Sequence, residues 1–142
     1  MSIKQISVFL ENQPGALNAL TGVLTQHEID IRALSLAEAS DFGIVRLIVD
    51  DVYKTTTVLK DAGYIHSITT VIGAEIPDVP GGLNKLLHIL TEANVNVEYM
   101  YAFLGRAGHA YMIIHVQDVQ AASSALNFTG IRLADQDEIS KL

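Results

Sequence analysis

The sequence predicts an α+β protein of two similar halves, each with an antiparallel sheet and helices on one face of that sheet. Two patterns support this prediction. Apolar residues alternate in some segments and recur every three or four positions in others, and this order of segments occurs twice. The composition agrees with it, because 49% hydrophobic and 18% charged residues in a chain of 142 can bury a core.

The first half begins with an alternating strand over 6–11, followed by a helix in which Leu17, Leu20 and Leu24 recur at helical spacing. Two strands rich in Ile, Val and Leu then follow, joined by a short turn. We expect Asp51 to cap the second helix and Gly63 to end it. After the first helix, the predicted elements are strands 29–39 and 43–51, helix 52–62 and strand 64–69.

The second half repeats this pattern. A shift of 66 positions places Pro14 and Gly15 on Pro80 and Gly81, and later in the repeat a shift of 67 places Asp51 on Asp118. The change of offset requires one inserted residue near 105–108. The predicted strands 97–104 and 110–118 follow a helix that carries Leu83, Leu86, Leu87 and Leu90.

The order strand, helix, strand, strand, helix, strand is that of a ferredoxin-like βαββαβ unit. We therefore expect two ferredoxin-like units, at residues 1–70 and 71–142. No linker rich in proline, serine or charge separates them, so we expect the units to be packed rigidly together.

Composition and charge exclude several classes of function. A net charge of −7 and the lack of a basic stripe argue against nucleic acid as a partner. The chain contains no cysteine, and no signal peptide or apolar run of about 18 residues is found, so we expect a cytoplasmic protein without a membrane partner.

Motifs for catalysis and metal binding are absent from the sequence. It has no G-x-S-x-G, Walker or G-x-G-x-x-G motif and no paired carboxylates, so we expect no enzyme and no cofactor. His109 and His115 lie six residues apart on a predicted strand, roughly 20 Å at ~3.3 Å per residue, too far to share a metal ion. We interpret these and His27, His66 and His88 as surface or core residues.

A strand, a loop ending in Pro-Gly, a helix and then Ile29–Ile31 or Val95–Val97 at the start of the next strand resemble the ACT domain. Almost the whole chain is similar to stand-alone tandem ACT proteins. The resemblance implies an amino-acid-binding regulatory protein of amino-acid metabolism, with ligand between two ACT units against the loop before the first helix. It also implies that the regulated activity belongs to a separate metabolic enzyme or transporter.

The two Pro-Gly corners are suitable for such a ligand on chemical grounds. A helix N-terminus offers free N–H groups and the positive end of the helix dipole to a carboxylate, and glycine permits close approach. Polar oxygens could accept from an ammonium group. The second corner, with two glycines, is the stronger candidate. The predicted ligand-binding residues are Asn12, Gln13, Pro14, Gly15, Ala16, Leu17, Asp30, Ile31, Asp78, Val79, Pro80, Gly81, Gly82, Leu83, Asn96 and Val97.

Two alternatives remain open. Pro-Gly corners are commonly structural turns, so the chain could instead be a non-catalytic assembly or scaffold module that acts by protein contact. In either case we expect a homodimer, because Tyr99, Tyr101 and Phe103 share one strand face while Met100 and Ala102 share the other, and helices cover only one face of such a sheet.

Overall fold

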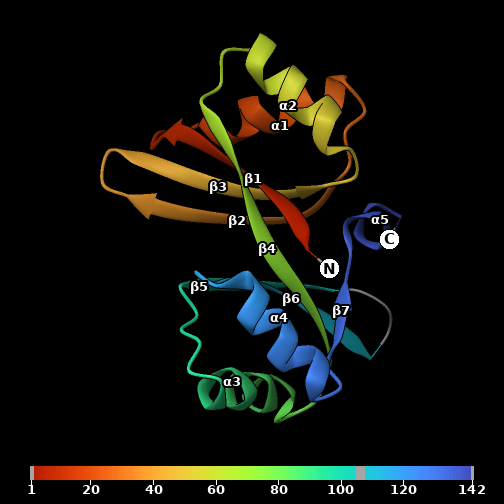
Figure 1. Ribbon diagram of the computed structural model, residues 1–142. Coiled ribbons are helices and arrows are strands. Elements are labelled where there is room, and N and C mark those ends of the chain that lie inside the picture. The colour runs from red at the N-terminus through yellow and green to blue at the C-terminus, as the bar shows by residue number, and fades with distance from the viewer. Residues whose placement is uncertain (1, 105–107, 142) are drawn as a thin grey trace. The chain divides into compact units, whose positions relative to one another are not determined.

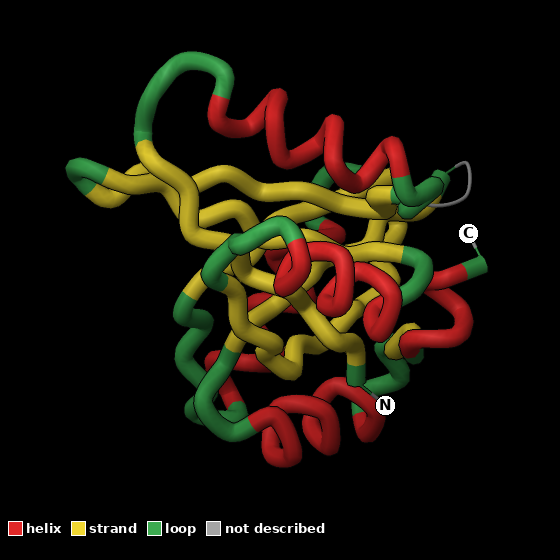
Figure 2. The backbone as a smooth tube through the Cα atoms, turned by 90° about the horizontal axis from the view of Figure 1, so that it is seen from above, coloured by secondary structure: helices red, strands yellow, loops and turns green. Residues whose placement is uncertain are grey.

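The computed structural model describes residues 2–104 and 108–141, which divide into two compact units. The N-terminal unit comprises Lys4–Thr69 and Lys141, and the C-terminal unit comprises Thr70–Ser140 together with Ser2 and Ile3. The fourth strand continues without a break from residues of the first unit into residues of the second. Short loops join the helices and strands of each unit (Figure 2).

The N-terminal unit has the predicted order of elements, and its two helices lie on one face of its strands (Figure 1). Its strands pair antiparallel in the order β2, β3, β1, with Val8 opposite Val45 and Leu36 opposite Val45 on the other side. The elements are β1 (Ile3–Glu11), α1 (Ala16–Gln26), β2 (Ile31–Ala39), β3 (Phe42–Val49), α2 (Val52–Asp61) and the start of β4 (His66–Pro77).

The C-terminal unit repeats the pattern and adds a short final helix. Its antiparallel strands are ordered β5, β6, β4, and β7 pairs with the other edge of β4. The predicted α+β fold with two ferredoxin-like repeats is therefore confirmed. The further elements are α3 (Gly82–Glu92), β5 (Tyr99–Leu104), β6 (His109–His115), α4 (Val119–Phe128), β7 (Arg132–Ala134) and α5 (Gln136–Ser140).

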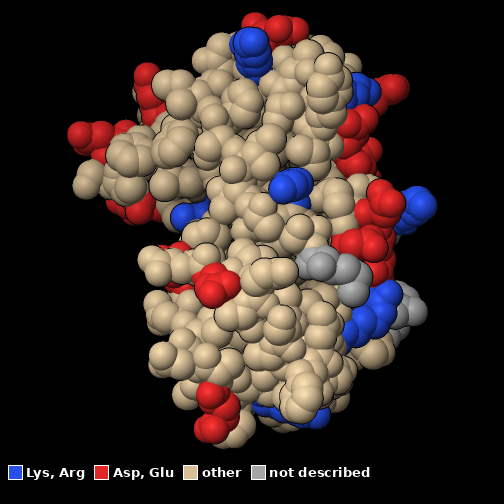
Figure 3. Space-filling view, viewed as in Figure 1, with Lys and Arg blue, Asp and Glu red and all other residues tan. Residues whose placement is uncertain are grey.

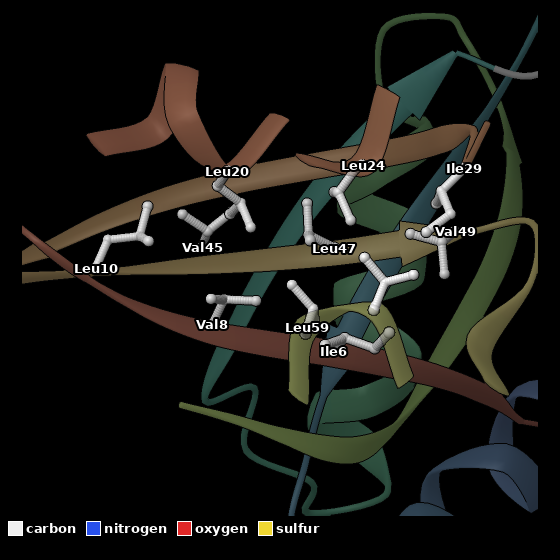
Figure 4. Packing of buried hydrophobic residues seen from close by; sticks show 11 residues of the cluster. Ile6, Val8, Leu10, Leu20, Leu24, Ile29, Val45, Leu47, Val49 and Leu59 are labelled. Atoms are coloured by element: carbon white, nitrogen blue, oxygen red, sulfur yellow. The ribbon is translucent and has the colours of Figure 1, made fainter. Parts of the chain in front are cut away.

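The core of the N-terminal unit lies between the helices and one face of the sheet (Figure 4). Alternate residues of β1 point to this face, and Leu20 and Leu24 of α1 pack on them with no exposed surface. Each fully buried aliphatic side chain stabilises the fold by about 1.5–3 kcal/mol. The buried cluster is Ile6, Val8, Leu10, Leu20, Leu24, Ile29, Val45, Leu47, Val49, Val58 and Leu59.

The C-terminal unit builds an equivalent core from equivalent positions. Leu86 and Leu90 of α3 occupy the places that Leu20 and Leu24 have in α1, as the shift of 66 predicts. The buried cluster is Ile72, Ala74, Ile76, Leu86, Leu90, Met112, Ile114, Val116, Ala122, Leu126 and Leu133.

The predicted cap of the second helix is present in both repeats. The Asp51 carboxylate accepts from the Lys54 N–H at 3.0 Å, and the Asp118 carboxylate accepts from the Ala121 N–H at 2.9 Å. Gly63, which follows α2 as predicted, is left-handed with φ 83°, and Gly130 has φ 85° at the matching place. The repeat thus extends to the backbone conformation. The insertion predicted near 105–108 falls mostly on residues 105–107, outside the described residues.

The sheet face opposite the helices differs from expectation in the C-terminal unit. Tyr111 and Ile113 of β6 are 1% and 0% exposed within the single chain, and Tyr99, Tyr101 and Phe103 are half-buried. Phe103 stacks on Tyr111 with ring centroids 5.2 Å apart. The aromatic side chains of β5 and β6 thus pack on one another on this face, and the homodimer expected from it stays a prediction.

On the face shown in Figure 3, basic side chains are scattered and form no stripe. Among the described residues, no helix is long and apolar enough to cross a membrane.

We predict that Asp51→Ala and Asp118→Ala each lower the free energy of unfolding by about 1 kcal/mol, because each leaves an N-terminal N–H of its helix without an acceptor. Urea denaturation of the two variants measures this loss. The control is Asp61→Ala, an exposed acid at the C-terminal end of α2, where a negative charge brings no benefit from the helix dipole. A loss at Asp51 no larger than at Asp61 would contradict the role of the cap.

Candidate functional site

The first corner connects β1 to α1 through an exposed loop, Asn12–Gly15. Gly15 is the N-cap residue with φ 87°, a left-handed conformation that side chains disfavour. The Asn12 N–H donates to the Asp41 carbonyl at 3.2 Å, and the Asn12 side-chain amide donates to the Ser40 carbonyl at 3.2 Å. The β2–β3 hairpin therefore holds the start of the loop in place.

The N-terminus of α1 has no side-chain cap and no acidic residue in its first turn. Ala16 donates its N–H to the Gln13 carbonyl, and Ala19 begins the regular helical bonds by donating to Gly15. Within residues 2–104 and 108–141, no group accepts from the N–H groups of Leu17 and Asn18. Two adjacent donors at the positive end of the helix dipole are thus available to an anionic group.

The second corner, between β4 and α3, repeats this geometry. Gly81 is the left-handed N-cap with φ 89°, and α3 also lacks a side-chain cap and a first-turn acid. The Asp78 N–H donates to the Gly108 carbonyl at 2.9 Å, as Asn12 does to Asp41 in the first corner. The N–H groups of Leu83 and Asn84 have no acceptor in the described part of the chain. Val79 and Pro80, which lie in the loop between Asp78 and Gly81, are exposed.

The expectation that Gly82 leaves the second corner more open is wrong. Gly82 is buried, and a Cβ atom built on it would lie 2.4 Å from the Pro77 carbonyl oxygen. Glycine is needed there because the backbone of the preceding loop packs against it. Nothing lies within 4 Å of a Cβ on Gly15 or Gly81, so the two corners are equally open at their N-cap residues.

Asp30 and Ile31 lie at the opposite end of their unit from the first corner. They follow the C-terminus of α1, whose 11 residues span roughly 16 Å at ~1.5 Å per residue. Asp30 forms an ion pair with Arg32 at 3.1 Å, and its N–H donates to the Asp50 carboxylate at 3.0 Å. Within one unit the structure therefore does not bring these residues to the Pro-Gly loop.

Asn96 and Val97 have the corresponding place in the C-terminal unit, beyond the end of α3. Val97 packs partly against the core, whereas Asn96 is exposed and lines a polar cavity of about 440 Å³. The other lining residues are Ala93, Asn94, Val95, Glu98, Gln117, Asp118 and Ala121.

Gln13 and Ala16 line a smaller cavity of about 270 Å³ beside the first corner. It extends from the end of β1 to the first turns of α1, and Tyr64 from the loop after α2 completes it. The remaining lining residues are Phe9, Leu10, Glu11 and Ala19.

Sequence reasoning missed a charged cluster in the C-terminal unit. His109 Nδ1 lies 3.3 Å from Glu75 Oε1, and Arg132 Nη1 lies 2.7 Å from Glu75 Oε2. One feature of the sequence could have indicated this cluster, because Glu75 is the only charged residue in the apolar run Val71–Ile76. The described residues include no group of three or more His, Cys, Asp or Glu side chains that could hold a metal ion.

A family model of the ACT domain pair matches residues 1–142 of the chain. No curated protein matches it. The crystal structure of a protein from Bacteroides thetaiotaomicron is similar with a TM-score of 0.94 and 38% sequence identity, over 100% of this chain and 98% of that one.

Two further crystal structures share the fold at lower identity. The ligand-free regulatory subunit of aspartate kinase from Thermus thermophilus has a TM-score of 0.67 and 16% identity, over 89% of both chains. The regulatory subunit of aspartate kinase from Thermus flavus has a TM-score of 0.61 and 14% identity, over 88% of this chain and 90% of that one.

The packing around Gly82 predicts opposite effects for two glycine-to-alanine changes. Gly82→Ala should lower the free energy of unfolding by about 1–3 kcal/mol, because the new methyl group overlaps the Pro77 carbonyl. Gly22→Ala, at an exposed position of α1 with nothing within 4 Å, should raise it by about 1 kcal/mol through helix propensity. Chemical denaturation measures both, and a neutral Gly82→Ala variant would refute the close packing.

Proposed function

Because the chain belongs to the family of ACT domain pairs, we propose that it is a non-catalytic regulatory protein that binds an amino acid. The similar folds of two regulatory subunits of aspartate kinase support a regulatory role. The regulated activity would belong to a separate enzyme or transporter.

The observation that carries this proposal is a difference between the helices. In each repeat the second helix is capped by an aspartate, whereas the first helix has no side-chain cap. The uncapped ends leave the N–H groups of Leu17 and Asn18, and of Leu83 and Asn84, directed at the exposed loops. A ligand carboxylate would accept from these donors and take the place that Asp51 has at α2.

The rest of an amino acid needs an acceptor for its ammonium group. The side-chain oxygen of Asn12 is suited to this in the first corner, because its amide nitrogen already donates to Ser40. The exposed carboxylate of Asp78 is suited to it in the second corner. Since Asp30, Ile31, Asn96 and Val97 lie far from the loop of their own unit, we propose that they contact ligand held by another ACT unit.

We predict that one amino acid raises the melting temperature of the protein and that Asn18→Asp combined with Asn84→Asp weakens its binding at least tenfold. The new carboxylates occupy the third position of α1 and α3, where they satisfy the helix ends themselves and repel the ligand carboxylate. A thermal-shift screen of the twenty amino acids identifies the ligand, and calorimetry measures the dissociation constants.

This double variant separates loss of binding from loss of folding. Acidic residues in the first turn stabilise a helix by roughly 0.3–1 kcal/mol, so the variant should be at least as stable as the parent. The control, Gln120→Glu, places the same charge in the first turn of α4, which Asp118 already caps, and should leave binding unchanged. Unchanged affinity in the double variant would refute the corner site, and a failure of all twenty amino acids would favour the scaffold alternative.

We also propose that the protein is a homodimer. The support comes from the exposed apolar side chains of the N-terminal unit. Leu34 and Leu36 on the edge strand β2 are 39% and 56% exposed, and Phe9 and Phe42 on neighbouring strands are 40% and 42% exposed. An edge strand with exposed leucines favours pairing with another chain.

Light scattering at micromolar concentration should therefore give twice the mass of 15.4 kDa, and Leu36→Lys should shift the population to monomer. Tyr53→Lys is the control, because Tyr53 is an exposed aromatic residue on α2, away from the edge strand. A monomeric parent protein would contradict the homodimer.

A further inference from the structure

A second cavity, of about 390 Å³, lies in the C-terminal unit where β4 ends, and four of its lining residues are ionisable. They come from four elements: Glu75 from β4, Lys85 from α3, His109 from β6 and Arg132 from β7. Pro77, Gly130 and Ile131 complete the lining. None of these seven residues belongs to the proposed amino-acid site.

Glu75 organises the cavity. Its side chain is 6% exposed, and its two carboxylate oxygens contact His109 at 3.3 Å and Arg132 at 2.7 Å. The other terminal nitrogen of Arg132 pairs with Glu138 on α5. A buried carboxylate is costly unless it is paired, so the contacts hold His109 and Arg132 in fixed orientations. His109 and Arg132 are themselves 47% and 52% exposed, and both line the cavity.

Lys85 adds a positive charge that takes no part in the ion pairs of Glu75, His109, Arg132 and Glu138. In residues 2–104 and 108–141 its side chain forms no ion pair or hydrogen bond. Lys85 is an exposed residue of α3, one helical turn after Gly81. The fold therefore does not require a positively charged side chain at this position.

The first repeat has a cavity at the equivalent place, which is lined by Glu11, Gln13 and Tyr64 as well as by apolar residues. Shifts of 66 and 67 match Glu75 with Phe9, Lys85 with Ala19, His109 with Phe42 and Arg132 with Ile65. Phe9 and Ala19 line the cavity of about 270 Å³, the Phe42 ring lies 6.2 Å from the Phe9 ring, and the Ile65 carbonyl accepts from the Phe9 N–H at 3.0 Å.

The four ionisable residues of the second cavity thus stand where the first repeat has apolar residues, of which Phe9 and Ala19 line the first cavity. In the N-terminal unit Phe9, Phe42 and Ile65 are 40%, 42% and 73% exposed, so the fold does not require a charged residue at these places. Because packing does not require charge here, the four ionisable side chains favour a chemical role, and among the described residues Lys85 has no ion-pair partner.

We propose that the cavity of Glu75, Lys85, His109 and Arg132 binds a small oxyanion, a carboxylate or phosphate group of single charge. Lys85 supplies the main charge, His109 donates a hydrogen bond, and Glu75 positions His109 and Arg132. A volume of about 390 Å³ lies within the usual range for small-ligand pockets. The site lies beside the second Pro-Gly corner, because Lys85 follows Gly81 by one helical turn, but none of its seven lining residues belongs to the proposed amino-acid site.

The charge balance selects a monoanion. Among these five described side chains, the charges of Glu75 and Glu138 offset those of Lys85 and Arg132, so a protonated His109 adds one net positive charge. A polyphosphate would meet the two carboxylates without enough positive charge to offset it.

Binding to this site should strengthen as the pH falls. The Glu75 carboxylate favours a proton on Nδ1 of His109, which leaves Nε2 as an acceptor in the neutral ring. Protonation of His109 turns Nε2 into a donor toward the anion. In the described part of the chain, the charged side chains of this cluster are Glu75 on β4, Arg132 on β7, Glu138 on α5 and Lys85 on α3. The anion and the proton therefore bind cooperatively, because each raises the affinity for the other.

Nuclear magnetic resonance of the full chain tests the site directly. Sodium acetate and sodium phosphate are titrated separately at about pH 6, with sodium chloride keeping the ionic strength constant. We expect saturable shifts of the backbone amides of Lys85, Gly130 and Ile131 with at least one oxyanion, and an affinity at least threefold higher at about pH 6 than at about pH 8 for acetate. The two titrations distinguish a carboxylate ligand from a phosphate ligand.

The first repeat supplies the variants. Lys85→Ala installs the residue of the first cavity and should weaken binding about tenfold, since a charge-assisted contact is lost. His109→Phe should bind more weakly and lose the pH dependence. Lys54→Ala, an exposed lysine on α2, is the matched control and should leave the affinity unchanged.

Lys85→Ala removes only an exposed side chain and adds a good helix former, so it should fold normally. Amide shifts that do not saturate with either anion, or equal affinity in the parent and Lys85→Ala proteins, would overturn the proposal. A pH dependence that persists in a folded His109→Phe variant would overturn the role of His109.

Discussion

The left-handed glycine at the start of the first helix is the constraint on which each repeat depends. With φ near 90°, Gly15 and Gly81 reverse the chain from strand to helix within a few residues. This turn directs α1 and α3 back along their strands, so that Leu20 and Leu24, or Leu86 and Leu90, reach the buried sheet face. Glycine has no side chain to cap the helix, so the same residue that allows the packing also leaves the helix donors without partners.

Much of the fold could be predicted from local chemistry. Alternation fixed the sheet faces, and Asp51 and Asp118 act as the caps that their positions predict. Features that depend on contacts distant in sequence could not be predicted. The sequence predicts free space beside Gly82, yet the Pro77 carbonyl occupies that space. The charged cavity was missed because Glu75 and Arg132 are 57 residues apart and meet only through the pairing of β4 with β7. The helix α5 has too few residues to give a periodic pattern.

Duplication makes each repeat a reference for the other. Where both repeats keep the same chemistry, as at the left-handed glycines and the aspartate caps, the requirement comes from the backbone. Where they differ, as at Phe9 and Glu75, the fold tolerates either residue and the difference needs another explanation. The same comparison applies at Glu28 and Asn94, which both adopt positive φ after the first helix although neither is glycine. The backbone there fixes the conformation more strongly than the side chain does.

The uncapped ends of α1 and α3 also bear on local motion. Amide protons without an acceptor exchange with solvent far more readily than those held by Asp51 or Asp118, so the first turns of these helices should be the least protected parts of the four long helices. An anion seated on them would slow this exchange and draw the loops into the ordered part of each unit. Binding of an anion at these helix ends would then increase the order of the first helical turn, without any large movement of the fold.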